Sequence, residues 1–256
     1  MESRLNCKLF DRLGRSILPT AEAKVLYPRA LSILGDLTRL IDDITATSQT
    51  ISGELIIGAS TIPGTYILPE IAASFRNDNP GISFEIRIND SGRIVEAVAG
   101  NELLVGVVGA QSNNTKVQFQ PIANDELIMV AAGDYPVATN LTLKELGKLP
   151  FIIRERGSGT RKNIETFLTE KNHPLTSLNI CATLGSSAAV KEAVKANLGI
   201  SALSRYAVKN DLERGSLKKL HIEGFTMERS FYLVTSPKRT LPNHYLQFVK
   251  RILKYK

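Results

Sequence analysis

Hydroxyl side chains recur in three turns where a predicted strand gives way to a predicted helix. The turns are Ala59–Gly64, Arg156–Thr160 and Leu184–Ser187. Backbone N–H groups in the first turn of a helix lack partners within the helix, and the helix dipole favours negative charge there. Ser and Thr are also ordinary N-cap residues, so capping explains any one turn alone. The three together, one of them with two glycines, predict a site for an anion or carboxylate.

The candidate effector-binding residues come from these turns and from neighbouring strand ends. They are Ser60, Thr61, Ile62, Gly109, Arg154, Gly157, Ser158, Gly159, Thr160, Ser186, Ser187 and Ser204. Arg154, Arg156 and Arg161 surround the glycine-containing turn and can pair with a carboxylate, a phosphate or a sulfur oxyanion. Gly109 follows a buried strand and leaves room for close approach to the backbone. We therefore expect a small anionic ligand.

Catalytic chemistry has little support in the sequence. The histidines His173, His221 and His244 are isolated, and none has the spacing of a metal site. The chain has no Gly-x-Ser-x-Gly elbow, dinucleotide fingerprint or Walker A lysine, and no pair of carboxylates stands out as an acid–base couple. We expect no catalytic residue, no metal and no cofactor, and hence a protein that is not an enzyme.

Alternating strands and helices begin after residue 52 and would position these turns. The first half predicts strands at 54–59, 83–89 and 103–108 with helices at 63–77 and 92–100. The second half predicts strands at 126–132, 151–154, 180–184 and 199–204. It predicts a helix at 142–146, a second helix from the turn Arg156–Thr160 to about residue 171, and a third from the turn Leu184–Ser187 to residue 197. Two βαβαβ series predict an α/β fold with mostly parallel sheets, whose ligands bind beyond the carboxyl ends of the strands. Two such lobes would face one cleft.

The last predicted strand, 230–235, and the last helix, 245–255, should return to the first lobe, which otherwise lacks closing elements. The chain would then cross between lobes near 124–126 and 224–229. This divides the chain into lobe I, residues 53–125 plus 229–256, and lobe II, residues 126–228.

A long helix is predicted from about Thr20 to Thr47. Its apolar residues recur at alternating spacings of four and three, which is a heptad seam. The seam consists of Leu26, Ala30, Ile33, Leu37, Leu40 and Ile44. The helix could pack on its own domain, but a narrow seam with polar flanks favours contact with a partner chain, and hence a homodimer.

Composition bounds the class of protein. The chain has 256 residues, 43% of them hydrophobic, and no apolar run long enough to span a membrane. Residues 1–12 do not resemble a signal peptide, and Cys7 and Cys181 are expected to be reduced thiols, so we expect a cytoplasmic protein. The net charge of +7 arises in residues 201–256, which carry 12 basic and 4 acidic side chains. This basic end is expected to be a solvated face rather than a nucleic-acid surface.

The first thirty residues resemble a known family. The segments Leu9–Arg12, Arg15, Leu18, Thr20–Ala23 and the helix through Ile33-Leu34 resemble the wing and linker helix of LysR-type transcriptional regulators. The remainder is similar to the effector-binding domain of that family, which has the fold of type 2 periplasmic binding proteins. The turn at Ala59–Gly64 and the run Arg154–Arg161 resemble the effector turns of CysB- and CbbR-like members.

The resemblance implies a regulator that dimerises through its linker helix, residues 20–52, and that can pair further into a tetramer. It implies a small effector that controls transcription. Residues 1–19 would be the remnant of a winged helix-turn-helix, with Glu2–Leu5 as the last turn of the recognition helix. DNA contact in this portion would be limited to Arg12 and Arg15. The sequence departs from the family pattern at Asn6 and Ala23, which replace glycines, and at Leu104, which replaces an acidic residue. The alternative is a stand-alone solute-binding protein of the same fold, which the wing-like start and the lack of a signal peptide disfavour.

Overall fold

The computed structural model describes residues 1–13, 16–45 and 51–255. It begins with a short helix, α1 (Glu2–Leu5), which ends at Asn6 in the left-handed conformation, with φ 49°. Asparagine tolerates this conformation better than most residues, which explains how it can replace a glycine here. Strands β1 (Phe10–Leu13) and β2 (Ser16–Pro19) then pair antiparallel. Arg15 and the side chain of Arg12 lie outside the described residues.

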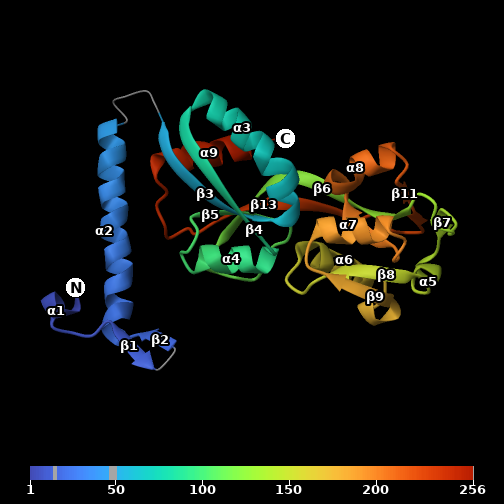
Figure 1. Cartoon of the computed structure of the whole chain (residues 1–256), viewed down its shortest axis with the longest axis horizontal. Helices are drawn as coiled ribbons and strands as arrows, with labels where there is room; N and C mark the ends of the chain where they lie inside the picture. Colours follow the sequence, from blue (N-terminus) through green and yellow to red (C-terminus); the bar gives the residue numbers. More distant parts are fainter. Residues whose placement is uncertain (14–15, 46–50, 256) are drawn as a thin grey trace.

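Helix α2 (Ala21–Thr45) stands beside the α/β body in Figure 1. Ile33, Leu37 and Leu40 of the predicted seam are 68%, 52% and 56% exposed. Leu26 and Ala30 are half-buried, and the side chain of Ile44 lies outside the described part of the chain. The described part of the seam therefore exposes large apolar side chains that its own chain leaves mostly uncovered.

The first lobe is built on three parallel strands. Their order is β4 (Gly81–Asn89), β3 (Ser52–Ser60) and β5 (Val105–Val108), as the first βαβαβ series predicts. Helix α4 (Ser91–Ala99) covers the sheet, and α9 (Asn243–Leu253) packs against α3 (Leu68–Asp78) (Figure 1). The rings of Phe75 and Phe248 meet edge-on between these two helices, with their centroids 5.2 Å apart.

The helix expected at 63–77 is two elements rather than one. A π-helical turn, η1 (Pro63–Ile67), precedes α3, which restarts at Leu68. Pro69 lies in the first turn of α3, where its missing N–H is tolerated because those groups have no helical partner. The predicted helical segment is therefore present, but its first part has π-helical rather than α-helical hydrogen bonding.

The second lobe is also built on parallel strands that helices connect. Strands β8 (Pro150–Arg154) and β9 (Asn179–Leu184) are parallel, and β8 also meets the segment before β10 (Ser201–Ser204) through the Ile152 N–H and the Ile200 carbonyl, 2.8 Å apart. Helices α6 (Gly159–Glu170) and α7 (Ser187–Lys195) connect these strands. The shorter elements are β7 (Asn140–Leu141), α5 (Leu143–Leu146), η2 (Leu175–Ser177), β11 (Leu217–Lys219) and β12 (His221–Ile222). The parallel arrangement predicted for this half is confirmed for β8 and β9, whereas β10 pairs antiparallel with β6 (Gln118–Ala132), which the prediction did not foresee.

Helix α8 (Arg205–Glu213) was not predicted. It follows β10 without a break, and the Ser204 hydroxyl accepts its first-turn N–H from Tyr206 at 3.2 Å. Charged residues dominate the helix, and only Ala207 and Val208 are buried. So short an apolar face gives little periodicity to detect.

Two long strands connect the lobes. Strand β6 (Gln118–Ala132) pairs antiparallel with β13 (Glu228–Thr235) in the first lobe and continues to pair with β10 and β11 in the second. Strand β13 also pairs with β5. The sequence predicted β6 only from residue 126, because Pro121 and several polar residues in its first half are untypical of a buried strand. The register shift between Phe231 and Tyr232 lies opposite this proline, where a strand cannot donate a ladder hydrogen bond. Within the described residues, no helix is long and apolar enough to cross a membrane.

Candidate functional site

The carboxyl ends of β3, β4, β5 and β8 meet in a narrow cleft between the lobes. Its lining residues are Ser60, Thr61, Ile62, Asp90, Ser91, Gly109, Arg154, Ser158, Gly159, Thr160, Arg229 and Phe231. The free volume among them is about 10 Å³, roughly the space that one water molecule needs. A larger ligand can enter only if the lobes or the side chains between them rearrange.

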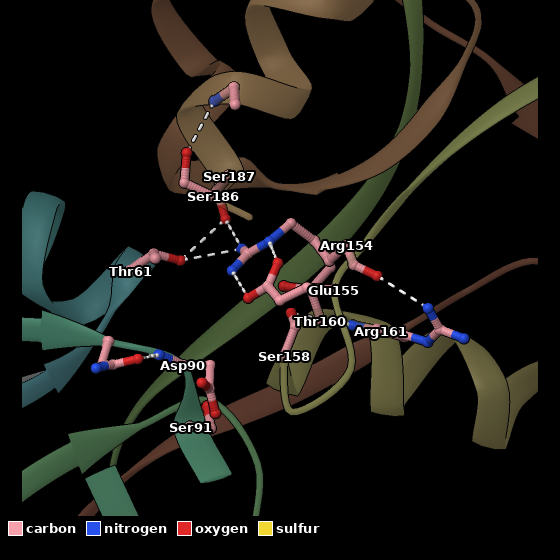
Figure 2. Close-up of polar contacts among 12 residues, drawn as sticks. Thr61, Asp90, Ser91, Arg154, Glu155, Ser158, Thr160, Arg161, Ser186 and Ser187 are labelled. Carbon is pink, nitrogen blue, oxygen red and sulfur yellow. Dashed lines mark hydrogen bonds and ion pairs between the residues drawn. The ribbon is translucent and has the colours of Figure 1, made fainter. Parts of the chain in front are cut away.

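Arg154 ends β8 in the second lobe and spans the cleft (Figure 2). Its side chain is only 3% exposed. Nη1 donates to the hydroxyls of Thr61, at 3.1 Å, and of Ser187, at 2.5 Å, and these two hydroxyls are themselves 3.1 Å apart. Nε and Nη2 donate to the two carboxylate oxygens of Glu155, both at 2.7 Å. One guanidinium therefore joins the first-lobe turn at Thr61 to the start of α7, with a carboxylate on its other edge.

Arg229 is a second buried guanidinium in this cleft, from the connecting strand β13. Nε donates to Oδ2 of Asp125 at 2.8 Å, and Nη1 donates to the Thr160 hydroxyl at 3.0 Å. Nη2 lies 2.8 Å from the same Asp125 oxygen, too poorly aligned to count as a hydrogen bond among the described residues. Burial lowers the pKa of Arg229 and the nearby charge of Arg154 lowers it further, whereas Asp125 opposes both.

The glycine turn brings α6 against the first lobe. Ser158 caps α6 by accepting the N–H of Arg161, and a Cβ at Gly159 would lie 2.9 Å from the carbonyl carbon of Gly109. Gly157 has φ +93°, and its carbonyl accepts the N–H of Gly92 across the cleft at 3.3 Å. A side chain at either glycine would separate the lobes, so both glycines are needed for the close approach.

The structure brings most of the predicted residues together. Eight line the cleft, namely Ser60, Thr61, Ile62, Gly109, Arg154, Ser158, Gly159 and Thr160, and the Ser187 hydroxyl reaches it through Arg154. Three lie elsewhere. Gly157 lines an adjoining hollow, Ser186 caps α7 by accepting the N–H of Ala189, and Ser204 donates to Asp125 at the connection between lobes.

The sequence reasoning missed five residues of this region. Asp90 and Ser91 follow β4 in a fourth strand-to-helix turn, where the Asp90 side chain accepts the N–H of Arg93. The same pattern of a polar cap after a strand could have found them. No such signal marks the other three, Arg229, Phe231 and Glu155. Arg229 and Phe231 reach the cleft only because β13 returns to the first lobe.

The adjoining hollow has a volume of about 570 Å³ between α4 and α6. Arg156, Arg161 and Lys162 line it. Arg161 pairs with Glu165 at 2.7 Å, and Lys162 donates to the carbonyl of Gln111 at 2.6 Å. An anion approaching the cleft from this side meets a positive surface.

A family model of the LysR substrate binding domain matches residues 48–255. The chain belongs to the LysR family. The HTH-type transcriptional regulator YeiE of Escherichia coli K12 is 31% identical over 250 residues, covering 97% of this chain and 83% of that protein. A probable RuBisCO transcriptional regulator of Guillardia theta is also 31% identical, over 99% of this chain and 83% of its own length.

Solved structures of the family share the fold. The regulatory domain of Synechocystis PCC6803 CcmR, in complex with 2-PG, superposes with a TM-score of 0.71 at 25% identity, over 79% of this chain and 96% of that one. Full-length OxyR of Pseudomonas aeruginosa gives 0.74 at 15% identity, over 100% and 85%. The effector-binding domain of QuiR, in complex with shikimate, gives 0.71 at 20% identity, over 80% and 97%.

The chain therefore carries the effector-binding domain of a LysR-type transcriptional regulator, of the type 2 periplasmic-binding-protein-like fold. Its relatives are regulators of transcription, and the alternative of a stand-alone solute-binding protein is not favoured.

Proposed function

We propose that this LysR domain senses a small anion in the cleft. A dimer of the chain then transmits the effect of anion binding to the interaction with DNA. The observation that carries the proposal is the pair of buried guanidiniums, Arg154 and Arg229, in a cleft that residues of three strand-to-helix turns line. Buried cations with hydroxyl groups between them favour a ligand of negative charge. The 2-PG and shikimate of the CcmR and QuiR complexes are the first candidates to test.

Residues 53–125 plus 229–256 and residues 126–228 would be the units that move. A ligand shifts their equilibrium only through different affinity for the two arrangements. Because the cleft has a free volume of about 10 Å³, a ligand must first bind an arrangement with more space and then draw the lobes onto itself.

The exposed seam of α2 supports a homodimer, which could associate further into a tetramer, in the cytoplasm. Residues 1–19, with Arg12 and Arg15, would belong to the winged helix-turn-helix that contacts DNA. Leu37→Asp should convert the dimer to a monomer, because it places a charge in the apolar seam. Size-exclusion chromatography with light scattering measures this. Ser32→Asp, off the seam on the same helix, should remain a dimer, and a dimeric Leu37→Asp variant would contradict the assignment.

A thermal-shift screen of small anions tests the effector site. The effector should raise the melting temperature of the wild-type protein, by an amount that grows with ligand concentration. Thr61→Ala and Thr160→Val should abolish that rise, because each removes one hydroxyl that contacts a cleft arginine. Circular dichroism should show that both variants remain folded. An unchanged ligand-induced rise in both would refute the site.

A further inference from the structure

The carboxylate of Glu155 occupies the outer edge of the Arg154 guanidinium. Both its oxygens accept from that edge at 2.7 Å, in the parallel two-bond geometry that an arginine forms with any planar carboxylate. Glu155 follows the last residue of β8 and lies in an irregular segment. Figure 2 shows its side chain turned back onto the arginine that precedes it in the chain.

The charges of the cleft balance through two carboxylates of unequal freedom. Asp125 has a side chain 0% exposed and is held by Arg229 and by the Ser204 hydroxyl. The Glu155 side chain is 27% exposed, and its carboxylate is held by the Nε and Nη2 edge of Arg154. Moving Asp125 away would leave both members of a buried pair without a partner, whereas an exchange at Arg154 returns the partly exposed Glu155 carboxylate to water and gives the buried arginine the incoming carboxylate instead. Exchange of Glu155 for another carboxylate leaves the net charge of the cleft unchanged.

We propose that the Glu155 carboxylate occupies the position that a carboxylate of the effector takes on binding, and that the effector displaces Glu155 from Arg154. This inference rests on the proposed function. The carboxylate of the effector takes the Nε and Nη2 edge, while Thr61 and Ser187 keep Nη1 in place. Glu155 then competes with every anion, and a planar carboxylate that replaces both of its hydrogen bonds competes better than a spherical anion such as chloride.

Removal of the competing side chain tests the exchange with acetate as the probe, whatever the natural effector is. Glu155→Ala leaves a carboxylate-sized space beside Arg154, so acetate should raise the melting temperature of this variant by several degrees more than chloride at equal ionic strength. The wild-type protein should show no such difference. Glu165→Ala is the matched control, because it removes the same charge from Arg161 in the adjoining hollow and leaves Arg154 unchanged. Parallel acetate responses in all three proteins would overturn the proposal.

Affinity for a carboxylate effector provides the second measurement. If Glu155 holds Arg154 most of the time, its removal raises the fraction of binding-competent protein, and Glu155→Gln should tighten the apparent Kd about tenfold. Glu165→Gln should leave the Kd unchanged. Isothermal titration with shikimate, or with the best carboxylate of the anion screen, measures this change. Because glutamine has nearly the shape of glutamate, this variant also serves if Glu155→Ala does not fold.

The two hypotheses fail differently. An effector that stabilises wild-type and both Glu155 variants with equal affinity overturns the exchange and leaves the proposed function intact. Specific acetate binding in Glu155→Ala, with no anion that stabilises the wild-type protein, would argue against effector sensing in this cleft and against displacement of Glu155.

Discussion

Two arginine–carboxylate pairs lie in one cleft, and they differ in the freedom of the acidic partner. Both arginine side chains are 3% exposed, whereas Asp125 is 0% exposed and Glu155 is 27% exposed. Asp125 and Arg229 face each other on paired strands, β6 and β13, and strand pairing fixes their approach. Arg154 ends a strand, and Glu155 lies just beyond it. The first pair therefore belongs to the frame that joins the lobes, and the second belongs to the part that can respond to a ligand.

The largest expected effect breaks the framework pair. Asp125→Asn leaves Arg229 buried without a compensating charge, and should lower the free energy of unfolding by about 3–5 kcal/mol. Urea denaturation followed by circular dichroism measures it. Glu126→Gln is the control, because Glu126 is 32% exposed and pairs with Arg205 and Lys219 at the surface. A loss for Asp125→Asn no larger than that of the control would remove the distinction between the two pairs.

An intermediate effect is expected where the lobes touch. Gly159→Ala places a Cβ 2.9 Å from both the Gly109 carbonyl carbon and the Ser91 hydroxyl, and should cost about 1–3 kcal/mol while it forces the lobes apart. Denaturation gives the energy, and small-angle scattering gives the change in radius of gyration. Gly185→Ala, where nothing lies within 4 Å of the added carbon, should be neutral. Equal stability of the two variants would show that the contact between the lobes accommodates an added methyl group at residue 159.

The smallest expected effect is on the exchangeable pair. Glu155→Gln should lower the free energy of unfolding by about 1–2 kcal/mol, less than Asp125→Asn, because the carboxylate that is lost is 27% exposed and an amide oxygen can still accept one hydrogen bond from the buried Arg154. The same urea experiment compares it directly with Asp125→Asn. A loss as large as that of Asp125→Asn would mean that Glu155 is also part of the frame, and would argue against its displacement.

Much of this arrangement could be predicted from local patterns. Strand and helix periodicity predicted the parallel strands β3, β4 and β5, and β8 with β9, because each element carries its own apolar repeat. The hydroxyl turns predicted Thr61, Ser158 and Thr160 as residues near a ligand. Helix α8 and the first half of β6 escaped, since their burial depends on neighbours distant in sequence rather than on a strong repeat of their own.

The sequence by itself determined which groups could hold an anion, because a hydroxyl or glycine at the start of a helix has the same chemistry in any fold. Tertiary structure alone decided which of them meet. It directed Ser204 away from the cleft to Asp125, and brought Arg229 in from a strand 104 residues beyond Asp125. It also turned Glu155 onto Arg154. The first two outcomes depend on burial and strand pairing between distant segments, which a local sequence pattern does not record. The third joins neighbours in sequence, but it depends on Arg154 being held in the cleft by Thr61 and Ser187.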